Sequence, residues 1–357
     1  MKITHIIEAT ATGTLSMAAL LANAQVKRGH IVSVIYSARS ETPREFNNLF
    51  DKEIKLFQVQ MNSPKEKLIS ILPLRKTLNS LSPDKVFMHS SFAGFLGRLA
   101  ALFTLNKTKF LYIPHCISFM RKDIGQFKKI VFITLEWIGS LKKSSYIACS
   151  KSEQLAIQAA IPFRKCYLVE NALDFSSVPA TSKSSLTNER TVITVGQIRL
   201  QKGPEHFAEI AKAVRSKDPS INFLWVGDGD PPLRKILESA GVRISGWASK
   251  EQVWAFLSEA DLYLSTALWE GMPVSVLEAM SIGVPVVASD CAGNIDVVDH
   301  DKTGWLFNKN ADAASLIIKA FSQKELSAEV AQNALRTAKE RFNLNRYLKD
   351  MEALLSK

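Results

Sequence analysis

The chain has 357 residues, 46% of them apolar, and glycine and proline are not enriched. These values exclude disordered and fibrous proteins and favour two hydrophobic cores, since 357 residues exceed what one core normally fills. The formal net charge of +11 comes from the first half, because residues 1–185 hold 25 Lys and Arg against 12 Asp and Glu, whereas residues 186–357 hold 20 against 22. This asymmetry is typical of a surface that meets nucleic acid, an anionic membrane or a phosphorylated substrate, although a basic surface that only aids solubility gives the same excess.

Strand-like and helix-like segments alternate along the first half of the chain. Residues 3–7 predict a strand, residues 15–29 an amphipathic helix and residues 30–36 a second strand, so the chain opens as a βαβ unit. Further strand-like segments follow at 85–90, 109–116 and 145–150.

Neither a secretory signal nor a transmembrane helix is expected. The N-terminus opens directly on an apolar strand without a basic flank, which favours a cytosolic chain. The apolar segments 93–105 and 130–141 are too short to span a membrane and carry Arg98 and Glu136. The four cysteines lack metal-ligand spacing and indicate reduced thiols that fill the core: Cys116, Cys149, Cys166 and Cys291.

Residues 174–190 are rich in Ser, Thr and Pro, have no apolar period and predict an interdomain linker. A second alternating series follows, with helical segments at 204–217 and 250–260. Its strand-like segments are 191–196, 221–227, 242–246, 262–266 and 284–289. We therefore predict an α/β protein with two tandem Rossmann-like domains, each a doubly wound parallel sheet, over residues 1–173 and 191–340. A final helix over 341–357 is long enough to cross back to the first domain.

Polar residues follow the predicted strands, where ligands bind in open parallel sheets. Arg199 and Lys202 lie between the 191–196 strand, which ends at Gly196, and a helix that begins near Pro204. Cations above a helix N-terminus suit a diphosphate. Gly227 follows the next strand. Gly246 and Trp247 follow the one after it, where backbone in a glycine turn can lie against a flat base.

Two glutamates flank a predicted helix start at the last of these strand ends. A helix beginning near Pro273 points its free N–H groups toward the ligand edge of the sheet and attracts phosphate. Glu270 lies at the strand end, and Glu278 lies about one and a half turns into the helix. Two carboxylates eight residues apart can accept hydrogen bonds from separate hydroxyl groups of one elongated ligand.

At these residues the sequence resembles the retaining nucleotide-sugar glycosyltransferases of family 4, which have two domains facing a central cleft in the GT-B fold. The segment "EGMPVSVLEAMSIGVPVVASDCAG" carries the Glu, seven residues, Glu motif of that family, and "VGQIRLQKG", "VGDGD", "ISGWASKEQV", "EADLYLS" and "TGWLF" match its other landmarks. The resemblance is dense from about 191 to 308.

The resemblance implies that Glu278 binds the ribose hydroxyls, that Glu270 contacts the donor sugar and that Lys202 neutralises the diphosphate. Many members have arginine where this chain has Gln197, so Arg199 is taken as its substitute. Backbone groups for sugar and phosphate are expected from Gly271, Met272, Pro273 and Val274.

In the first domain the paired glycines of the family are replaced by Gly13 and Thr14, where acceptor or phosphate contact is expected. His115 follows a strand and a proline, as does a histidine that lines the donor-sugar pocket in similar enzymes, whereas His89 and His30 are interpreted as structural. Asp228 and Asp230 resemble a metal-binding pair that belongs to a different glycosyltransferase fold, so no metal is assigned.

The resemblance implies transfer of a sugar, with retention of configuration, from a nucleotide diphosphate sugar to a glycan hydroxyl. A UDP-sugar is the first expectation for the donor. The acceptor is expected to be a polyprenyl-diphosphate-linked oligosaccharide in surface polysaccharide assembly. A nucleotide-sugar 2-epimerase and a non-catalytic sugar-nucleotide- or lipid-binding subunit remain alternatives.

Basic residues alternate with Leu, Ile and Phe at 68–76, 119–132 and 140–145, which suits an anionic bilayer, and no nucleic-acid motif is present. We therefore expect a cytoplasmic enzyme that docks peripherally on the inner membrane face. The charges expected to meet the membrane are Lys128, Lys129, Lys142 and Lys143.

Overall fold

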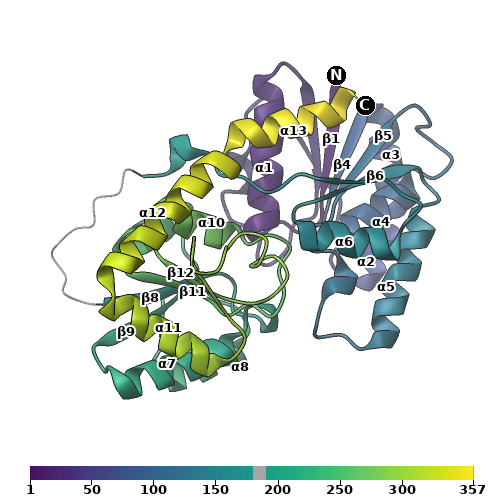
Figure 1. The fold of residues 1–357 in the computed structure, drawn as a ribbon. Coiled ribbons are helices and arrows are strands. Elements are labelled where there is room, and N and C mark those ends of the chain that lie inside the picture. Colours follow the sequence, from purple (N-terminus) through teal and green to yellow (C-terminus); the bar gives the residue numbers. More distant parts are fainter. Residues whose placement is uncertain (180–189, 357) are drawn as a thin grey trace. The chain divides into compact units, whose positions relative to one another are not determined.

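The computed structural model describes residues 1–179 and 190–356, which form two compact units. The N-terminal unit contains Met1–Asn171 together with Leu348–Lys357, and the C-terminal unit contains Ala172–Tyr347. Figure 1 labels the elements of each unit. Most of the predicted linker, 180–189, lies outside the described residues.

The N-terminal unit is built on a seven-stranded sheet in the order β3-β2-β1-β4-β5-β6-β7. All its strand pairs are parallel, and the order reverses between β1 and β4. The strands are β1 (Lys2–Ile7), β2 (Ile31–Tyr36), β3 (Lys55–Gln58), β4 (Lys85–His89), β5 (Lys109–Ile113), β6 (Ser144–Ala148) and β7 (Cys166–Leu168).

Both faces of this sheet are covered, as the nearly continuous apolar character of its central strands requires. Every residue of β4 is buried. Val86 and Met88 pack in one core with Leu96, whereas His5 on the opposite face bonds Gln25 of the first helix. The helices are α1 (Thr12–Lys27), α2 (Pro64–Ile69), α3 (Ile71–Leu81), α4 (Ser91–Ala100), α5 (Gln126–Gly139) and α6 (Lys151–Ala160).

The C-terminal unit has a six-stranded parallel sheet in the order β10-β9-β8-β11-β12-β13. Its strands are β8 (Arg190–Val195), β9 (Ile221–Val226), β10 (Arg243–Ile244), β11 (Leu262–Ser265), β12 (Val286–Ser289) and β13 (Trp305–Phe307). The predicted fold class, two α/β domains with doubly wound parallel sheets, is confirmed.

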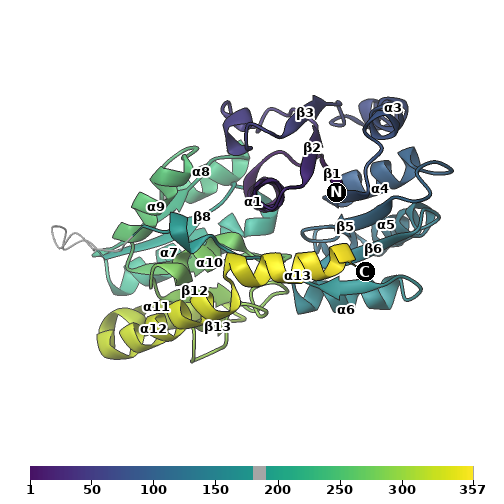
Figure 2. The same ribbon diagram turned by 90° about the horizontal axis from the view of Figure 1, so that it is seen from above.

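Phe207 anchors the core of the C-terminal unit, because its ring meets Phe223 and Trp225 edge-on at centroid distances of 5.7 and 5.2 Å. Its helix, α7 (Pro204–Lys217), contacts α11 (Asn310–Ser322), and the two lie side by side in Figure 2. The helices are α7 (Pro204–Lys217), α8 (Pro231–Ser239), α9 (Lys250–Glu259), α10 (Val274–Ser281), α11 (Asn310–Ser322) and α12 (Lys324–Arg341).

The last helix, α13 (Leu344–Ser356), ends in the N-terminal unit, to which residues 348–357 belong. There the buried Lys85 donates from Nζ to the Leu355 carbonyl at 2.6 Å, and Arg28 pairs with Glu352 at 2.7 Å. The predicted domain limits at 173, 191 and 340 remain sequence-based predictions.

All four cysteines lie within the described residues as thiols and not as disulfides, and Cys149 and Cys291 are buried. Within residues 1–179 and 190–356, no helix combines the length and the apolar character needed to cross a membrane.

Candidate active site

Three glycines bring the carboxyl ends of β8, β9 and β10 together. A Cβ at Gly227 would lie 2.2 Å from the Gly196 carbonyl oxygen, and Gly227 and Gly246 form an isolated bridge. All three have positive φ, at 154°, 137° and 75° for Gly196, Gly227 and Gly246. The Trp225 indole donates to the Gly196 carbonyl at 2.8 Å. Close approach of the Gly196 carbonyl therefore explains Gly227. A Cβ at Gly196 would lie 3.0 Å from the Lys202 side chain, whereas the space around Gly246 is open.

Glu270 and Lys202 form an ion pair at this edge of the sheet. The Lys202 Nζ lies 2.7 Å from Glu270 Oε1, and Gln201 donates from Nε2 to Glu270 Oε2 at 3.3 Å and to the Trp269 carbonyl at 3.0 Å. Burial acts to lower the pKa of Lys202, but the Glu270 carboxylate outweighs it, so the pKa is raised. The lysine is therefore a permanent cation at neutral pH.

The loop after β12 fixes the backbone of Glu270. The Glu270 N–H donates to the Ala292 carbonyl at 2.9 Å. Gly293, at φ +90°, packs so closely that a Cβ would lie 2.5 Å from the Glu270 Cβ. Asn294 is fully buried and donates from Nδ2 to the Ser289 carbonyl at 3.0 Å, which holds the loop in place. Sequence reasoning recognised "DCAG" as part of a motif but gave none of these residues a role.

The predicted helix start lies beside this pair. Helix α10 begins at Val274 with Pro273 at its N-cap position, without a side-chain cap or an acidic residue in its first turn. Gly271 and Met272 precede it and are buried. The helix start agrees with the sequence-based expectation to within one residue. The N–H groups that a first turn leaves unpaired are the kind of group that attracts an anion.

Glu278 on the same helix has a cation partner that the sequence did not reveal. Its carboxylate is 5% exposed and pairs with Lys250, the first residue of α9. The Lys250 ammonium also lies 4.6 Å from the ring centroid of Trp254. A helix-capping "SKEQ" sequence was visible, but nothing in it indicated that the lysine reaches Glu278.

Arg199 and Trp247 are exposed in the structure, Trp247 by 59%. Asp228 and Asp230 have structural partners: Asp228 pairs with Arg234 at 2.6 Å, and Asp230 accepts from the Leu233 N–H at the start of α8. Within the described part of the chain, no group of three His, Cys, Asp or Glu side chains is arranged to hold a metal.

The predicted residues of the N-terminal unit lie at the carboxyl edge of its own sheet. Gly13 and Thr14 lie in the first turn of α1, which has no side-chain cap and no acidic residue there. His115 follows β5 in the left-handed region at φ 56°, and Cys116 follows at φ 98°. Such values are uncommon for residues with a side chain, so the turn must be held by its surroundings.

Glu153 supplies that support. Its carboxylate accepts the N–H groups of Cys116 and Ile117 at 2.8 Å each and that of Cys149 at 2.8 Å. Burial raises the pKa of Glu153 and the three N–H donors counter it. Ser150 and Glu153 have the Ser-x-x-Glu spacing of a helix N-terminus, which is the sequence signal that marks this residue.

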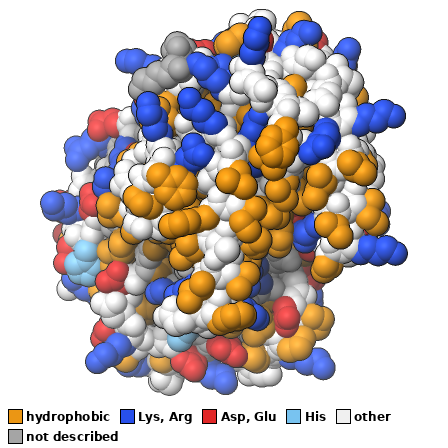
Figure 3. All heavy atoms as spheres, turned by 90° about the vertical axis from the view of Figure 1, so that its right-hand side faces the viewer, with side chains coloured by type: hydrophobic (Ala, Val, Ile, Leu, Met, Phe, Trp, Pro, Cys, Tyr) orange, Lys and Arg blue, Asp and Glu red, His pale blue; other side chains and the backbone are white. Residues whose placement is uncertain are grey.

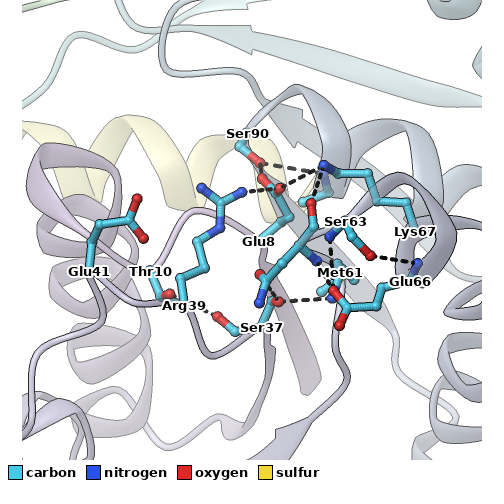
Figure 4. Close-up of polar contacts among 12 residues, drawn as sticks. Glu8, Thr10, Ser37, Arg39, Glu41, Met61, Ser63, Glu66, Lys67 and Ser90 are labelled. Atoms are coloured by element: carbon cyan, nitrogen blue, oxygen red, sulfur yellow. Dashed lines mark hydrogen bonds and ion pairs between the residues drawn. The ribbon is translucent and has the colours of Figure 1, made fainter. Parts of the chain in front are cut away.

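A polar cluster around Glu8 lies where the strand order reverses, and sequence reasoning missed it (Figure 4). Glu8 follows β1 and is 2% exposed; its Oε1 pairs with Arg39 and lies 3.9 Å from the Lys67 ammonium. Ser90, which follows β4, donates to Glu8 Oε2 at 3.0 Å. In open parallel sheets, ligand-binding residues follow the carboxyl ends of the strands. This rule was used for the second sheet, and applied to β1 and β4 it would have identified Glu8 and Ser90.

Lys67 also reaches two further groups, donating to the Asn62 carbonyl at 2.8 Å and lying 3.9 Å from the ring centroid of Phe92. The cluster thus combines a buried carboxylate with two partly exposed cations, and it can bind both hydroxyl and anionic groups.

Comparison with known proteins identifies both units. A model of the group 1 glycosyl transferases matches residues 180–337, and a model of glycosyltransferase family 4 matches residues 12–177. An uncharacterized 41.2 kDa protein in the cps region of Klebsiella pneumoniae is 30% identical over 283 residues, which are 74% of this chain and 78% of that protein. The UDP-Gal:alpha-D-GlcNAc-diphosphoundecaprenol alpha-1,3-galactosyltransferase of Escherichia coli is 29% identical over 270 residues, 68% of this chain and 66% of that enzyme.

Solved structures show the same fold. HepE of Anabaena, in complex with UDP and glucose, superposes with a TM-score of 0.83 at 20% identity and covers 100% of this chain and 99% of its own. Sucrose-phosphate synthase of Thermosynechococcus elongatus gives 0.85 at 18% identity, covering 100% and 98%. The expected GT-B fold is confirmed, and the chain belongs to glycosyltransferase family 4 as a sugar-transferring enzyme.

Proposed function

We propose that the enzyme transfers a sugar, with retention of anomeric configuration, from a nucleotide diphosphate sugar to a hydroxyl of a polyprenyl-diphosphate-linked oligosaccharide in surface polysaccharide assembly. The observation that carries the proposal is the Glu270–Lys202 pair beside the uncapped start of α10, at the carboxyl edge of the second sheet. Such a donor requires three recognition elements: a carboxylate for the sugar hydroxyls, and a cation and helix N–H groups for the diphosphate.

The donor lies along this edge in the proposal. Glu278 accepts the ribose hydroxyls, and its carboxylate also pairs with Lys250. Gly246 and Trp247 receive the base, because the backbone there is open and the indole is exposed. Arg199 and Lys202 meet the diphosphate. UDP is the first candidate nucleotide, since HepE binds UDP and glucose and the E. coli relative uses UDP-Gal.

The proposed chemistry is a front-face substitution. The bond between the anomeric carbon and the leaving diphosphate oxygen breaks, the acceptor hydroxyl oxygen bonds to the same face of that carbon, and its proton passes to the departing diphosphate. Lys202 and the α10 N–H groups stabilise the charge that develops on the diphosphate, where the loss of one such donor costs roughly 10²-fold or more in rate. Glu270 orients the sugar through its hydroxyls.

The acceptor is assigned to the Glu8 cluster of the N-terminal unit. Glu8 accepts hydroxyl hydrogens of the acceptor glycan, while Arg39 and Lys67 offer N–H groups to its diphosphate. Two observations support this assignment: the cluster lies at the switch point of its sheet, and the E. coli relative is named for a diphosphoundecaprenol-linked substrate.

The membrane proposal rests on exposed apolar side chains among basic ones in the N-terminal unit. On α5, Phe127 is 79% exposed and Ile130 61% exposed, and Leu141 just beyond is 70% exposed. Figure 3 shows apolar side chains gathered on one face with Lys and Arg around them. Lys128 and Lys143 are exposed and Lys129 partly so, which suits contact with anionic headgroups.

Lys142 was wrongly expected among these membrane-facing charges. Its side chain turns inward, where Nζ bonds the Thr104 carbonyl and lies 5.0 Å from the ring centroid of Phe110. Burial lowers its pKa. The apolar-basic pattern at 140–145 did not predict the inward direction of Lys142, because the consecutive lysines at 142 and 143 point to opposite sides of the backbone just before β6.

Liposome flotation tests docking. Replacing Lys128, Lys129 and Lys143 together by Glu removes about 1 kcal/mol of attraction per lysine and should weaken binding to anionic vesicles by more than about 100-fold. Binding that survives this triple change, or that ignores anionic lipid content, would refute the electrostatic proposal. The charge-matched control replaces three exposed lysines of the C-terminal unit by Glu: Lys235, Lys302 and Lys324.

A transfer assay tests the function itself. The full chain is incubated with UDP-, GDP-, dTDP- and ADP-sugars and a short-chain diphosphate-linked acceptor, and the anomeric configuration of the product is read by NMR. An α-linked product from an α-linked donor supports retention. Formation of the epimerised donor in the absence of acceptor would instead identify an epimerase. Stoichiometric binding of the donor, with neither transfer nor slow hydrolysis of the donor, would identify a binding subunit.

A further inference from the structure

Three histidines form a continuous hydrogen-bonded chain that runs from the fully buried His5 and His89 to the partly exposed His115. It starts on α1, where Gln25 Oε1 lies 2.7 Å from His5 Nε2. His5 Nδ1 then lies 2.9 Å from His89 Nε2, and His89 Nδ1 lies 3.0 Å from His115 Nε2. The rings are stacked, with centroid distances of 5.2 and 5.3 Å.

All three rings are neutral at physiological pH. Burial lowers the pKa of His5 and of His115 to about 4, and it lowers that of His89 well below its usual value. A neutral imidazole has one N–H donor and one lone pair. Each contact between two rings must therefore pair one N–H donor with one lone pair. All hydrogen bonds of the chain are then donated in the same direction.

The Gln25 carbonyl oxygen selects that direction, because it can only accept. His5 must then carry its proton on Nε2 and accept on Nδ1 from His89 Nε2, and His89 must accept on Nδ1 from His115 Nε2. The last ring is left with its lone pair on Nδ1. One amide, 90 residues away in sequence, thus sets the tautomer of His115.

We propose that Gln25, His5 and His89 are positioning residues that hold His115 as the Nε2–H tautomer, so that its Nδ1 accepts a hydrogen bond from a hydroxyl of the donor sugar. This inference rests on the proposed function and on the role expected for His115 from the sequence, which is to line the donor-sugar pocket. Glu153 accepts the N–H groups of Cys116 and Ile117 and thereby holds the left-handed turn at His115 and Cys116. This keeps the His115 ring at the end of the hydrogen-bonded chain.

The tautomer has a consequence for the donor. An acceptor atom suits a sugar hydroxyl, which can donate, and opposes a sugar carboxylate, which at neutral pH can only accept. The site therefore favours a nucleotide hexose with a hydroxyl at this position over the corresponding hexuronate.

Nuclear magnetic resonance tests the tautomer directly. In the full chain labelled with ¹⁵N-histidine, long-range ¹H–¹⁵N correlations distinguish a protonated from an unprotonated ring nitrogen. His5, His89 and His115 should each show protonated Nε2 and unprotonated Nδ1 at pH 7. A protonated Nδ1 on His115 would overturn the proposal, and this measurement requires neither a variant nor turnover.

A variant series tests the role of Gln25. Gln25→Met removes the carbonyl acceptor while keeping a side chain of similar length, so His115 should no longer be held in a single tautomer. The kcat/KM for the UDP-hexose should fall by about 3- to 10-fold, which is the effect of losing one neutral hydrogen bond. Gln25→Glu, which restores an acceptor, should recover both, and the exposed Gln158→Met on α6 should change neither.

The outcomes separate this inference from the proposed function. An unchanged His115 spectrum in Gln25→Met, or a lower affinity for UDP alone in that variant, would contradict the inference. A fixed Nε2–H tautomer in a protein that transfers no sugar would support the tautomer assignment and contradict the proposed function.

Discussion

Changing Glu270 to Gln tests the ion pair that carries the proposed function. The substitution preserves the shape that Gly293 packs against and removes the negative charge 2.7 Å from the Lys202 ammonium. At an effective dielectric constant of about 20, two unit charges at that distance attract by roughly 6 kcal/mol. Desolvation of both groups opposes this attraction, and their side chains are 19% and 10% exposed, so we expect a net loss of about 1–3 kcal/mol in unfolding free energy.

Three measurements on Glu270→Gln give a distinctive pattern. The melting temperature should fall by about 2–4 °C per kcal/mol lost. Turnover should fall by roughly 10²-fold, because sugar orientation and the charge balance at the diphosphate are both disturbed. The dissociation constant of UDP, measured by titration calorimetry, should change less than about 3-fold, since in the proposal Glu270 contacts the sugar and not the nucleotide.

The double variant Lys202→Met, Glu270→Gln separates stability from activity. It removes the unpaired cation, so most of the lost stability should return while turnover stays low. Normal turnover in Glu270→Gln, or a loss of UDP binding equal to its loss of turnover, would refute the assigned role.

Three further predictions concern the nucleotide, the acceptor and pH. Glu278→Gln should weaken UDP binding by about 10-fold or more, as expected for losing a charge-assisted hydrogen bond, and calorimetry that shows unchanged affinity would contradict the ribose contact. Arg39→Gln should raise KM for a diphosphate-linked acceptor but not for the donor, whereas the exposed Lys65→Gln on α2 should raise neither; equal effects would remove the cluster from the acceptor site. Burial lowers the pKa of His5 in the folded protein from 6.5 to about 4. Between these pH values the unfolded chain therefore binds more protons than the folded one. The contribution of His5 to the unfolding free energy is then fully present above pH 6.5 and falls by up to about 1.4 kcal/mol per pH unit toward pH 4. Urea midpoints that stay constant from pH 7 to pH 5 would count against a neutral buried His5.

The sequence predicted the architecture and one half of the candidate site because those features are local. Apolar runs bounded by turn residues marked the strands, and Pro204 and Pro273 marked helix starts to within one residue. The order of strand ends then indicated which loops share an edge. Glu270 and Lys202 lie 68 positions apart and still meet at 2.7 Å, as that rule required.

The sequence did not predict partners that depend on side-chain direction. Lys250 reaches Glu278 from a different helix, and Lys142 turns inward beside a lysine that faces out. The histidine chain joins two strands, the turn after β5 and a helix. His5 lies in the middle of an apolar strand, where nothing in the pattern distinguishes a core residue from a functional one. These contacts depend on which face of each element is buried, and spacing alone does not determine that.

The N-terminal unit is discontinuous along the chain, and this affects the order in which the protein can mature on the ribosome. Its residues up to Asn171 are synthesised before the C-terminal unit, but its segment from Leu348 onward is synthesised only after that unit. Until that segment emerges, the buried Lys85 lacks the Leu355 carbonyl that it bonds in the finished protein. The N-terminal unit is therefore completed only after the C-terminal unit, and a nascent chain carries an open N-terminal unit throughout the synthesis of its neighbour.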